Sequence, residues 1–345
     1  MRERDGISEK RTTRRESLRH LAGMGLACAR LPIIATASAT ALLHTGCLSG
    51  QAGAEPDLII GSIGIGPGKF QKPRAIAIDA TDRLFVVDMT GRIQTFTADG
   101  EPLKQWRTPE IYQGKPTGLT IAPNGNLWVA DTHYHRVLEY TVDGELLEDR
   151  TLGGTQGIGP GEFGLVTDIV IDGEQRRYVS EYGENDRVQV FEPDGSVSLV
   201  FGRPGVEPGE FRRPQSLAID EQGHLWVADA CNHRIQVFDC SEGEARIVDV
   251  WGTEGRGAGE FRYPYGLVLA PQGTLVITEY GNHRVQLLKR TGEPIASWGA
   301  AGREPGQLDQ PWSTALDSRG RCFVLDSYNH RIQRFRFPAL PSMES

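Results

Sequence analysis

The stretch SLAIDEQGHLWVADACNHRIQVF, residues 216–238, contains the pattern that decides the fold. It predicts a short apolar strand, a turn, a second strand ending in an acidic residue, and a third strand opened by an arginine. Two clear copies follow at 266–288 and 313–335, and weaker copies begin at Ala75, Gly118 and Asp168. The arginine recurs six times, at intervals of 44 to 51 residues: Arg92, Arg136, Arg187, Arg234, Arg284 and Arg331. A strand-only repeat of this length indicates the blades of a β-propeller.

Counting the strands predicts how the ring closes. Several copies carry a fourth, outer strand that ends in an aromatic residue and glycine, as at 199–202, 248–252 and 296–299. The sixth copy has no such strand, whereas the apolar stretch 57–64 precedes the first copy. We therefore predict an all-β, six-bladed β-propeller with four-stranded antiparallel blades, in which the N-terminal strand completes the last blade and leaves no free edge.

The third strands begin with a shared motif, N-H-R-I/V-Q, at 232–236, 282–286 and 329–333. On these motifs and the strand ends before them, the chain resembles NHL-repeat proteins, a family of six-bladed β-propellers. The resemblance covers roughly residues 57–337. It implies the fold but leaves the function open, because one architecture supports many activities.

The first 47 residues lie outside the repeats. Residues 13–19, with Arg14 and Arg15, resemble a twin-arginine export signal, and an Ala/Leu-rich run follows. Two cleavage sites compete: residues 45–47 resemble the end of a lipobox with Cys47 as the lipidated residue, and 37–39 form an A-x-A site. The small, polar tether at 48–56 favours the lipoprotein. We expect a periplasmic or membrane-anchored protein whose propeller spans 57–337 and ends in a tail at 338–345.

Charge limits the kinds of partner. The whole chain has a formal net charge of −8, and the leader contains eight of its 37 basic residues but only four of its 45 acidic ones. The repeat region is therefore more acidic still. Nucleic-acid binding requires clustered cations, so we expect no nucleic-acid partner. We expect a monomer that contacts the membrane only through the lipid.

Two recurrent features favour structural roles. Gly-rich connectors, such as those at 157–163 and 205–211, lead into strands, whereas a phosphate loop opens a helix. Four histidines precede the repeat arginine in separate blades and cannot converge on one ion, so we predict no metal site and no cofactor. They are His135, His233, His283 and His330.

The residues that open the inner strands are the best candidates for binding. They should meet at one mouth of the central channel, and they are Arg74, Thr117, Thr167, Gln215, Tyr265 and Trp312. Asp168 follows inside the channel. Glu181 and Glu279 end second strands in matching Glu-Tyr-Gly sequences and are further ligand candidates. This mixture of cation, amide and aromatic groups suits a protein, peptide or polar small molecule, and a water-filled channel without a ligand is the alternative.

An enzyme is the competing functional hypothesis. The chain also resembles peptidyl-α-hydroxyglycine amidating lyases, whose zinc is held by histidines that open inner strands after proline. None of the six corresponding positions here is a histidine, so the resemblance does not extend to the zinc ligands. A gluconolactonase-like hydrolase with a metal in the channel could use oxygen ligands from Asp168, Glu181 and Glu279. Of the two classes, the sequence favours a non-catalytic binding module.

Overall fold

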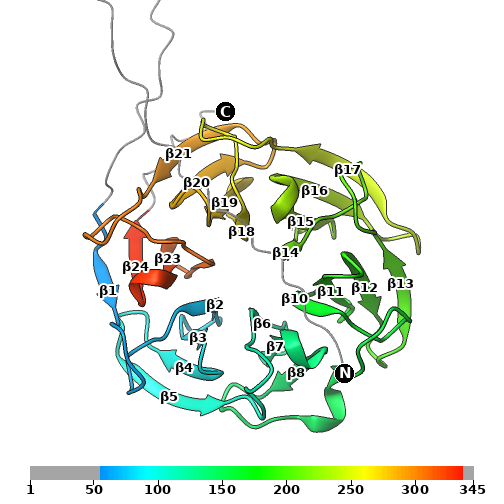
Figure 1. Ribbon diagram of the computed structural model, residues 1–345, viewed down its shortest axis with the longest axis horizontal. Coiled ribbons are helices and arrows are strands. Elements are labelled where there is room, and N and C mark those ends of the chain that lie inside the picture. The colour runs from blue at the N-terminus through cyan, green and yellow to red at the C-terminus, as the bar shows by residue number, and fades with distance from the viewer. Residues whose placement is uncertain (1–54, 337–345) are drawn as a thin grey trace, which may run out of the picture. The chain divides into compact units, whose positions relative to one another are not determined.

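Residues 55–336 are described by a computed structural model of the chain. The predicted export signal, Cys47, most of the tether and the tail lie outside the described residues. Within 55–336, no helix combines the length and the apolar character needed to cross a membrane. Six four-stranded antiparallel sheets surround a central space, with each inner strand beside it and each outer strand at the periphery (Figure 1). The predicted fold class is confirmed.

The strands follow the order expected of the repeats. The first three blades are β2 (Pro73–Ile78), β3 (Leu84–Asp88), β4 (Arg92–Phe96) and β5 (Pro102–Arg107); β6 (Gly118–Ile121), β7 (Leu127–Asp131), β8 (Arg136–Tyr140) and β9 (Leu152–Gly153); and β10 (Leu165–Ile171), β11 (Arg177–Tyr182), β12 (Arg187–Phe191) and β13 (Val197–Phe201). The fourth and fifth are β14 (Pro214–Ile219), β15 (Leu225–Asp229), β16 (Arg234–Asp239) and β17 (Arg246–Trp251); and β18 (Pro264–Ala270), β19 (Thr274–Glu279), β20 (Arg284–Lys289) and β21 (Pro294–Trp298). Short 3-10 turns are η1 (Thr132–Tyr134), η2 (Glu148–Arg150), η3 (Ala230–Asn232) and η4 (Ser327–Asn329).

The sixth blade joins the two ends of the repeat region. It consists of β22 (Thr314–Leu316), β23 (Arg321–Asp326), β24 (Arg331–Arg336) and, as its outer strand, β1 (Leu58–Ile60). β1 pairs antiparallel with β24, and the Asp57 carboxylate forms ion pairs of 2.7 Å with Arg334 and 2.8 Å with Arg336. The prediction that the N-terminal strand completes the last blade is therefore confirmed.

The core lies between the blades, with one apolar cluster at each of the six boundaries. The second strand of each blade contributes one side chain to the next boundary. These side chains are aromatic in five blades, Phe85, Trp128, Tyr178, Trp226 and Phe323, and Val276 is the exception. The connectors insert a fully buried residue at five boundaries: Phe70, Phe163, Phe211, Phe261 and Leu308. Because both rows are buried, the predicted packing role of the aromatic row and of the connector residues is confirmed.

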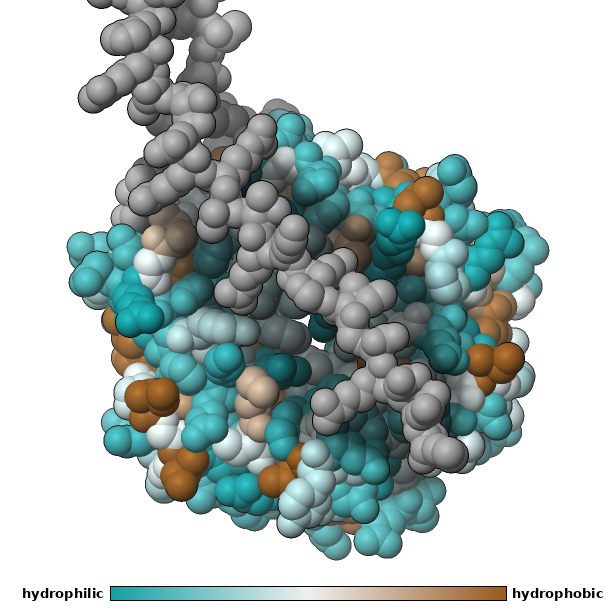
Figure 2. Space-filling model, viewed as in Figure 1, coloured by the Kyte–Doolittle hydropathy of each residue, from teal (hydrophilic) through white to brown (hydrophobic). Residues whose placement is uncertain are grey.

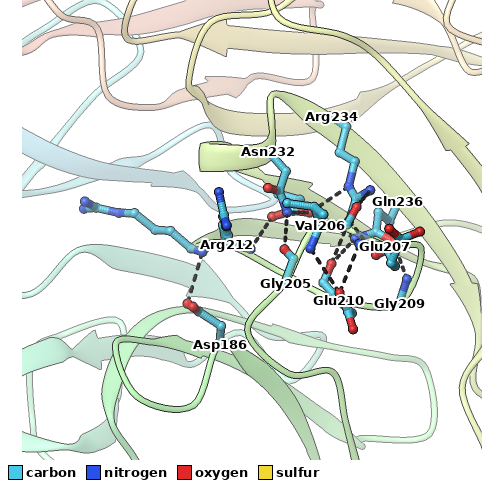
Figure 3. A network of polar contacts seen from close by, with 12 residues as sticks. Asp186, Gly205, Val206, Glu207, Gly209, Glu210, Arg212, Asn232, Arg234 and Gln236 are labelled. Atoms are coloured by element: carbon cyan, nitrogen blue, oxygen red, sulfur yellow. Dashed lines mark hydrogen bonds and ion pairs between the residues drawn. The ribbon is translucent and has the colours of Figure 1, made fainter.

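The repeat motif fixes each connector, as the fourth blade shows (Figure 3). Asp229 accepts hydrogen bonds of 2.8 Å from both Asn232 and Arg234. The same Asn232 amide nitrogen also donates to the carbonyl of Gly205, and the two terminal nitrogens of Arg234 donate to carbonyl oxygens of the connector 205–210. The Gln236 amide accepts from one connector N–H and donates to another carbonyl. The connector's polar backbone is therefore used inside the fold, as the structural interpretation predicts.

The repeat histidines link neighbouring blades. Each has a left-handed φ between 54° and 57°. Three of them accept a hydrogen bond through Nδ1 from the backbone N–H of the residue before the next blade's proline: His233 from Tyr263 at 3.1 Å, His283 from Gln310 at 3.1 Å and His330 from Lys72 at 3.0 Å. In the third blade Asp186 replaces the histidine and accepts from Arg213 at 3.1 Å. The predicted role of these histidines as turn residues is confirmed.

Candidate functional site

The central channel is bounded by the inner strands and has a volume of about 330 Å³. Four of the six predicted opening residues occupy β-bulges, where the pairing register skips one residue of the inner strand; these are Arg74, Thr167, Gln215 and Tyr265. A bulge re-aims the side chain of the extra residue. Thr117 and Trp312 lie just before β6 and β22. The repeated proline and bulge thus place equivalent residues of successive blades around one mouth.

Three of the predicted residues join neighbouring blades. The Thr117 hydroxyl donates to the carbonyl of Thr167 at 3.1 Å, and the Thr167 hydroxyl donates to that of Pro214. The Asp168 carboxylate accepts the N–H of Leu217 at 2.9 Å and the hydroxyl of Ser216 at 3.2 Å. Burial raises the pKa of Asp168 to about 7, although these hydrogen bonds oppose the rise. Most of the hydrogen bonds of these polar groups therefore join neighbouring blades.

Aromatic rings and arginines gather on the other side of the mouth. Tyr265 stacks on Tyr280 with ring centroids 4.7 Å apart and meets Trp312 edge-on at 5.0 Å. The Arg74 guanidinium lies 4.6 Å from the Trp312 ring, and that of Arg213 lies 5.0 Å from the Tyr265 ring. Tyr265 and Trp312 line the channel but are each only 8% exposed, so little of either ring is accessible.

This cluster carries positive charge. Burial lowers the pKa of Arg74, and repulsion from Arg213 lowers it further. Burial also lowers the pKa of His133, with Arg74 as the next cause. The tyrosines do not compensate, because burial raises the pKa of Tyr265 and of Tyr280 and keeps both neutral. Arg74 and Arg213 therefore place positive charge at the mouth, although the chain as a whole is acidic.

Glu181 and Glu279 lie elsewhere, at the blade ends. Both are fully buried. Glu279 accepts hydrogen bonds from the backbone of Arg262 and from Asn282, Arg284 and Gln286, and Glu181 has the equivalent partners in its own blade. The structure does not bring these carboxylates together with Asp168. They occupy the same position in the network as Asp229.

Two kinds of residue at the mouth were not among the predicted candidates. Tyr182 and Tyr280 follow the two glutamates: the Arg213 guanidinium lies 4.6 Å from the Tyr182 ring, and Tyr280 packs on Tyr265 and Trp312. Arg213 occupies the position before the blade's proline, with a left-handed φ of 59°. The shared Glu-Tyr-Gly sequence was a usable signal for the tyrosines. Nothing in the sequence shows that the Arg213 side chain points towards the mouth.

The outer surface shows no comparable concentration of groups on the face seen in Figure 2. That face is mostly hydrophilic, and its apolar residues are scattered towards the periphery. Large exposed apolar side chains include three on the connectors, Ile65, Ile158 and Val206. Scattered apolar residues are normal on protein surfaces. The channel mouth therefore remains the best candidate for a binding site.

Fold and site together define a six-bladed β-propeller with a cationic, aromatic channel mouth. Four segments of the chain match the NHL repeat, at residues 114–140, 211–238, 261–286 and 308–335. The chain thus contains NHL repeats on a six-bladed propeller, as the N-H-R motifs predicted.

Among curated proteins, human NHL repeat-containing protein 3 is 28% identical over 182 residues, which are 49% of this chain and 52% of that protein. Peptidyl-glycine alpha-amidating monooxygenase B of Xenopus laevis is 35% identical over 138 residues, 37% of this chain and 16% of that protein. A Caenorhabditis elegans protein assigned as a peptidyl-alpha-hydroxyglycine alpha-amidating lyase is 31% identical over 138 residues, 37% of this chain and 39% of that protein. The chain thus spans about half or less of the length of these relatives.

Solved structures are similar in fold. A streptogramin B lyase superposes with a TM-score of 0.56 at 13% identity, over 82% of this chain and 88% of that one. Virginiamycin B lyase from Staphylococcus aureus gives a TM-score of 0.54 at 14% identity, over 78% and 96%. At such identities the likeness shows the propeller fold alone.

Proposed function

We propose that this propeller is a non-catalytic binding module whose ligand, a protein, peptide or polar small molecule, docks at the channel mouth beside Arg74, Gln215, Tyr265 and Trp312. The observation that supports this proposal best is the pair of polar atoms without a partner in the cluster. Trp312 Nε1 and Arg74 Nε are buried and make no hydrogen bond within the described protein. A buried donor without an acceptor is costly, and a ligand oxygen that reached either atom would remove that cost.

A metal-dependent lyase is the second candidate, because two of the relatives are amidating enzymes by name. The residues at the mouth do not fit a zinc ion. Zinc sites use about three protein ligands from histidine, cysteine or carboxylate side chains, and the six opening positions supply none of these. A calcium-dependent hydrolase meets a similar objection, because Glu181 and Glu279 are engaged within their blades and do not converge with Asp168. Among residues 55–336, no three His, Cys, Asp or Glu side chains are grouped as metal ligands.

Export and lipidation belong to the same proposal. A twin-arginine signal and lipid attachment at Cys47 would place a monomeric propeller in the periplasm or on a membrane surface, where the mouth meets extracytoplasmic ligands. Replacing both Arg14 and Arg15 by lysine tests the route. The double variant is expected to accumulate inside the cell, and its export at the normal level would refute the assignment.

A thermal-shift screen with peptides and polar small molecules tests binding at the mouth. We expect a ligand that stabilises the wild type to lose its effect on Trp312→Phe, which keeps a ring but removes Nε1. Trp251→Phe is the matched control, because Trp251 lies on the outer strand β17 and packs on Phe261 with centroids 5.8 Å apart. If both variants respond like the wild type to every stabilising ligand, the mouth is not the binding site.

A further inference from the structure

Two arginines at the mouth differ from the repeat arginines in having no acidic partner. Arg187, Arg234, Arg284 and Arg331 each form an ion pair of 2.8 Å or less with the carboxylate that ends the preceding strand. Within residues 55–336, neither Arg74 nor Arg213 forms such a pair within 4.0 Å. A partly buried cation without a counter-charge is costly, and a second one beside it adds to the cost.

The surroundings hold both guanidinium groups in place. Arg74 lies over the Trp312 ring, and Arg213 lies over the rings of Tyr182 and Tyr265 and donates from Nε to the Gln215 side chain at 2.8 Å. The Arg213 backbone is fixed by its bond to Asp186 and by the following proline. Cation–π contacts orient the two cations but leave their charge uncompensated. The side chains are therefore positioned before any ligand arrives.

We propose that the mouth selects organic anions, with a carboxylate held by Arg74 and Arg213 and the body of the ligand against Trp312 and Tyr265. This inference rests on the proposed function and names its ligand class. Guanidinium groups bind carboxylates through paired, charge-assisted hydrogen bonds. The two aromatic side chains favour a ligand whose carboxylate is attached to an apolar or aromatic body.

Benzoate and benzamide are the probes, because they share one ring and differ in charge. Calorimetric titration of the purified protein is expected to show benzoate binding at least about tenfold more tightly than benzamide, which is the usual value of a charge-assisted bond. Arg74→Gln and Arg213→Gln should each weaken benzoate binding by about tenfold or more and leave benzamide unchanged. Arg290→Gln is the control, because Arg290 pairs with Glu221 at 2.7 Å and should not affect either probe.

Folding provides an independent readout. If the arginines are held for an anion, removing one relieves repulsion, so Arg74→Gln and Arg213→Gln should unfold at or above the wild-type temperature. Equal binding of the two probes, no benzoate binding, or a clear stability loss in both variants without a change in binding would overturn the inference. Equal binding that is abolished by Trp312→Phe would reject the anion preference alone and leave the mouth as the binding site.

Discussion

Replacing Ile60 by alanine tests ring closure through one side chain. Ile60 ends β1, is 5% exposed, and packs in the cluster between the sixth and first blades with Phe70, Phe96 and Ile332. Truncating a buried isoleucine to alanine costs about 2–5 kcal/mol, because transfer free energy is lost and a cavity remains. We expect Ile60→Ala to lower the free energy of unfolding by about 3 kcal/mol, a large part of the usual total of about 5–15 kcal/mol.

Ile59 supplies the matched control. It is the preceding residue of the same strand, is 40% exposed, and faces the opposite side of the sheet. Ile59→Ala should therefore change stability by less than about 1 kcal/mol. Equilibrium unfolding in urea, followed by tryptophan fluorescence, measures both variants. Equal losses, or a loss below about 1 kcal/mol for Ile60→Ala, would show that β1 does not close the ring as described. Truncation before Ile63 is expected to damage the whole fold for the same reason.

Further predictions concern pH, packing and metal. Burial lowers the pKa of His233, so the neutral ring contributes stability above about pH 6.5, and this contribution is lost as the pH falls. His233→Asn keeps a hydrogen-bond acceptor and should reduce the loss of stability at acid pH, measured by unfolding at several pH values. The raised pKa of Asp168 has the opposite sign: its contribution is greatest below about pH 4 and is lost as the pH rises through about 7, and Asp168→Asn should flatten that slope. Phe211→Ala should cost about 3–5 kcal/mol in urea unfolding, whereas a loss below 1 kcal/mol would contradict its packing role. Purified protein should contain no stoichiometric zinc or calcium and show no chelator-sensitive lyase or lactonase activity; metal analysis that finds either ion together with turnover would favour the enzyme.

Much of the fold could be predicted because the repeated motif marks where the strands of each blade lie. The spacing of the repeat arginines located the third strand of each blade. Counting the outer strands predicted that residues 57–64 pair with the last blade. The second blade was harder, because residues 141–151 lack alternation and the outer strand β9 is only two residues long. There the pattern that defines an outer strand is absent from the sequence.

The positions of the candidate residues around the channel were easier to predict than their contacts. The residues that open the inner strands could be placed at the mouth because, in five of the six blades, each directly follows a proline. The partners of each side chain depend on the neighbouring blade, which the sequence of one repeat does not contain. The threonines and Asp168 therefore turned out to bind adjacent blades, and Tyr265 and Trp312 to be buried against each other. Arg213 was missed because its direction depends on a left-handed backbone angle.

The most direct test of the central claim is a crystal structure of the protein grown with 4-bromobenzoate, in which the anomalous signal of bromine locates the ligand. The proposed function and ligand class predict one bromine peak at the channel mouth, with the carboxylate within hydrogen-bonding distance of Arg74 and Arg213. A mouth without ligand at saturating concentration, with the bromine at other arginines or on the outer strands, would contradict them.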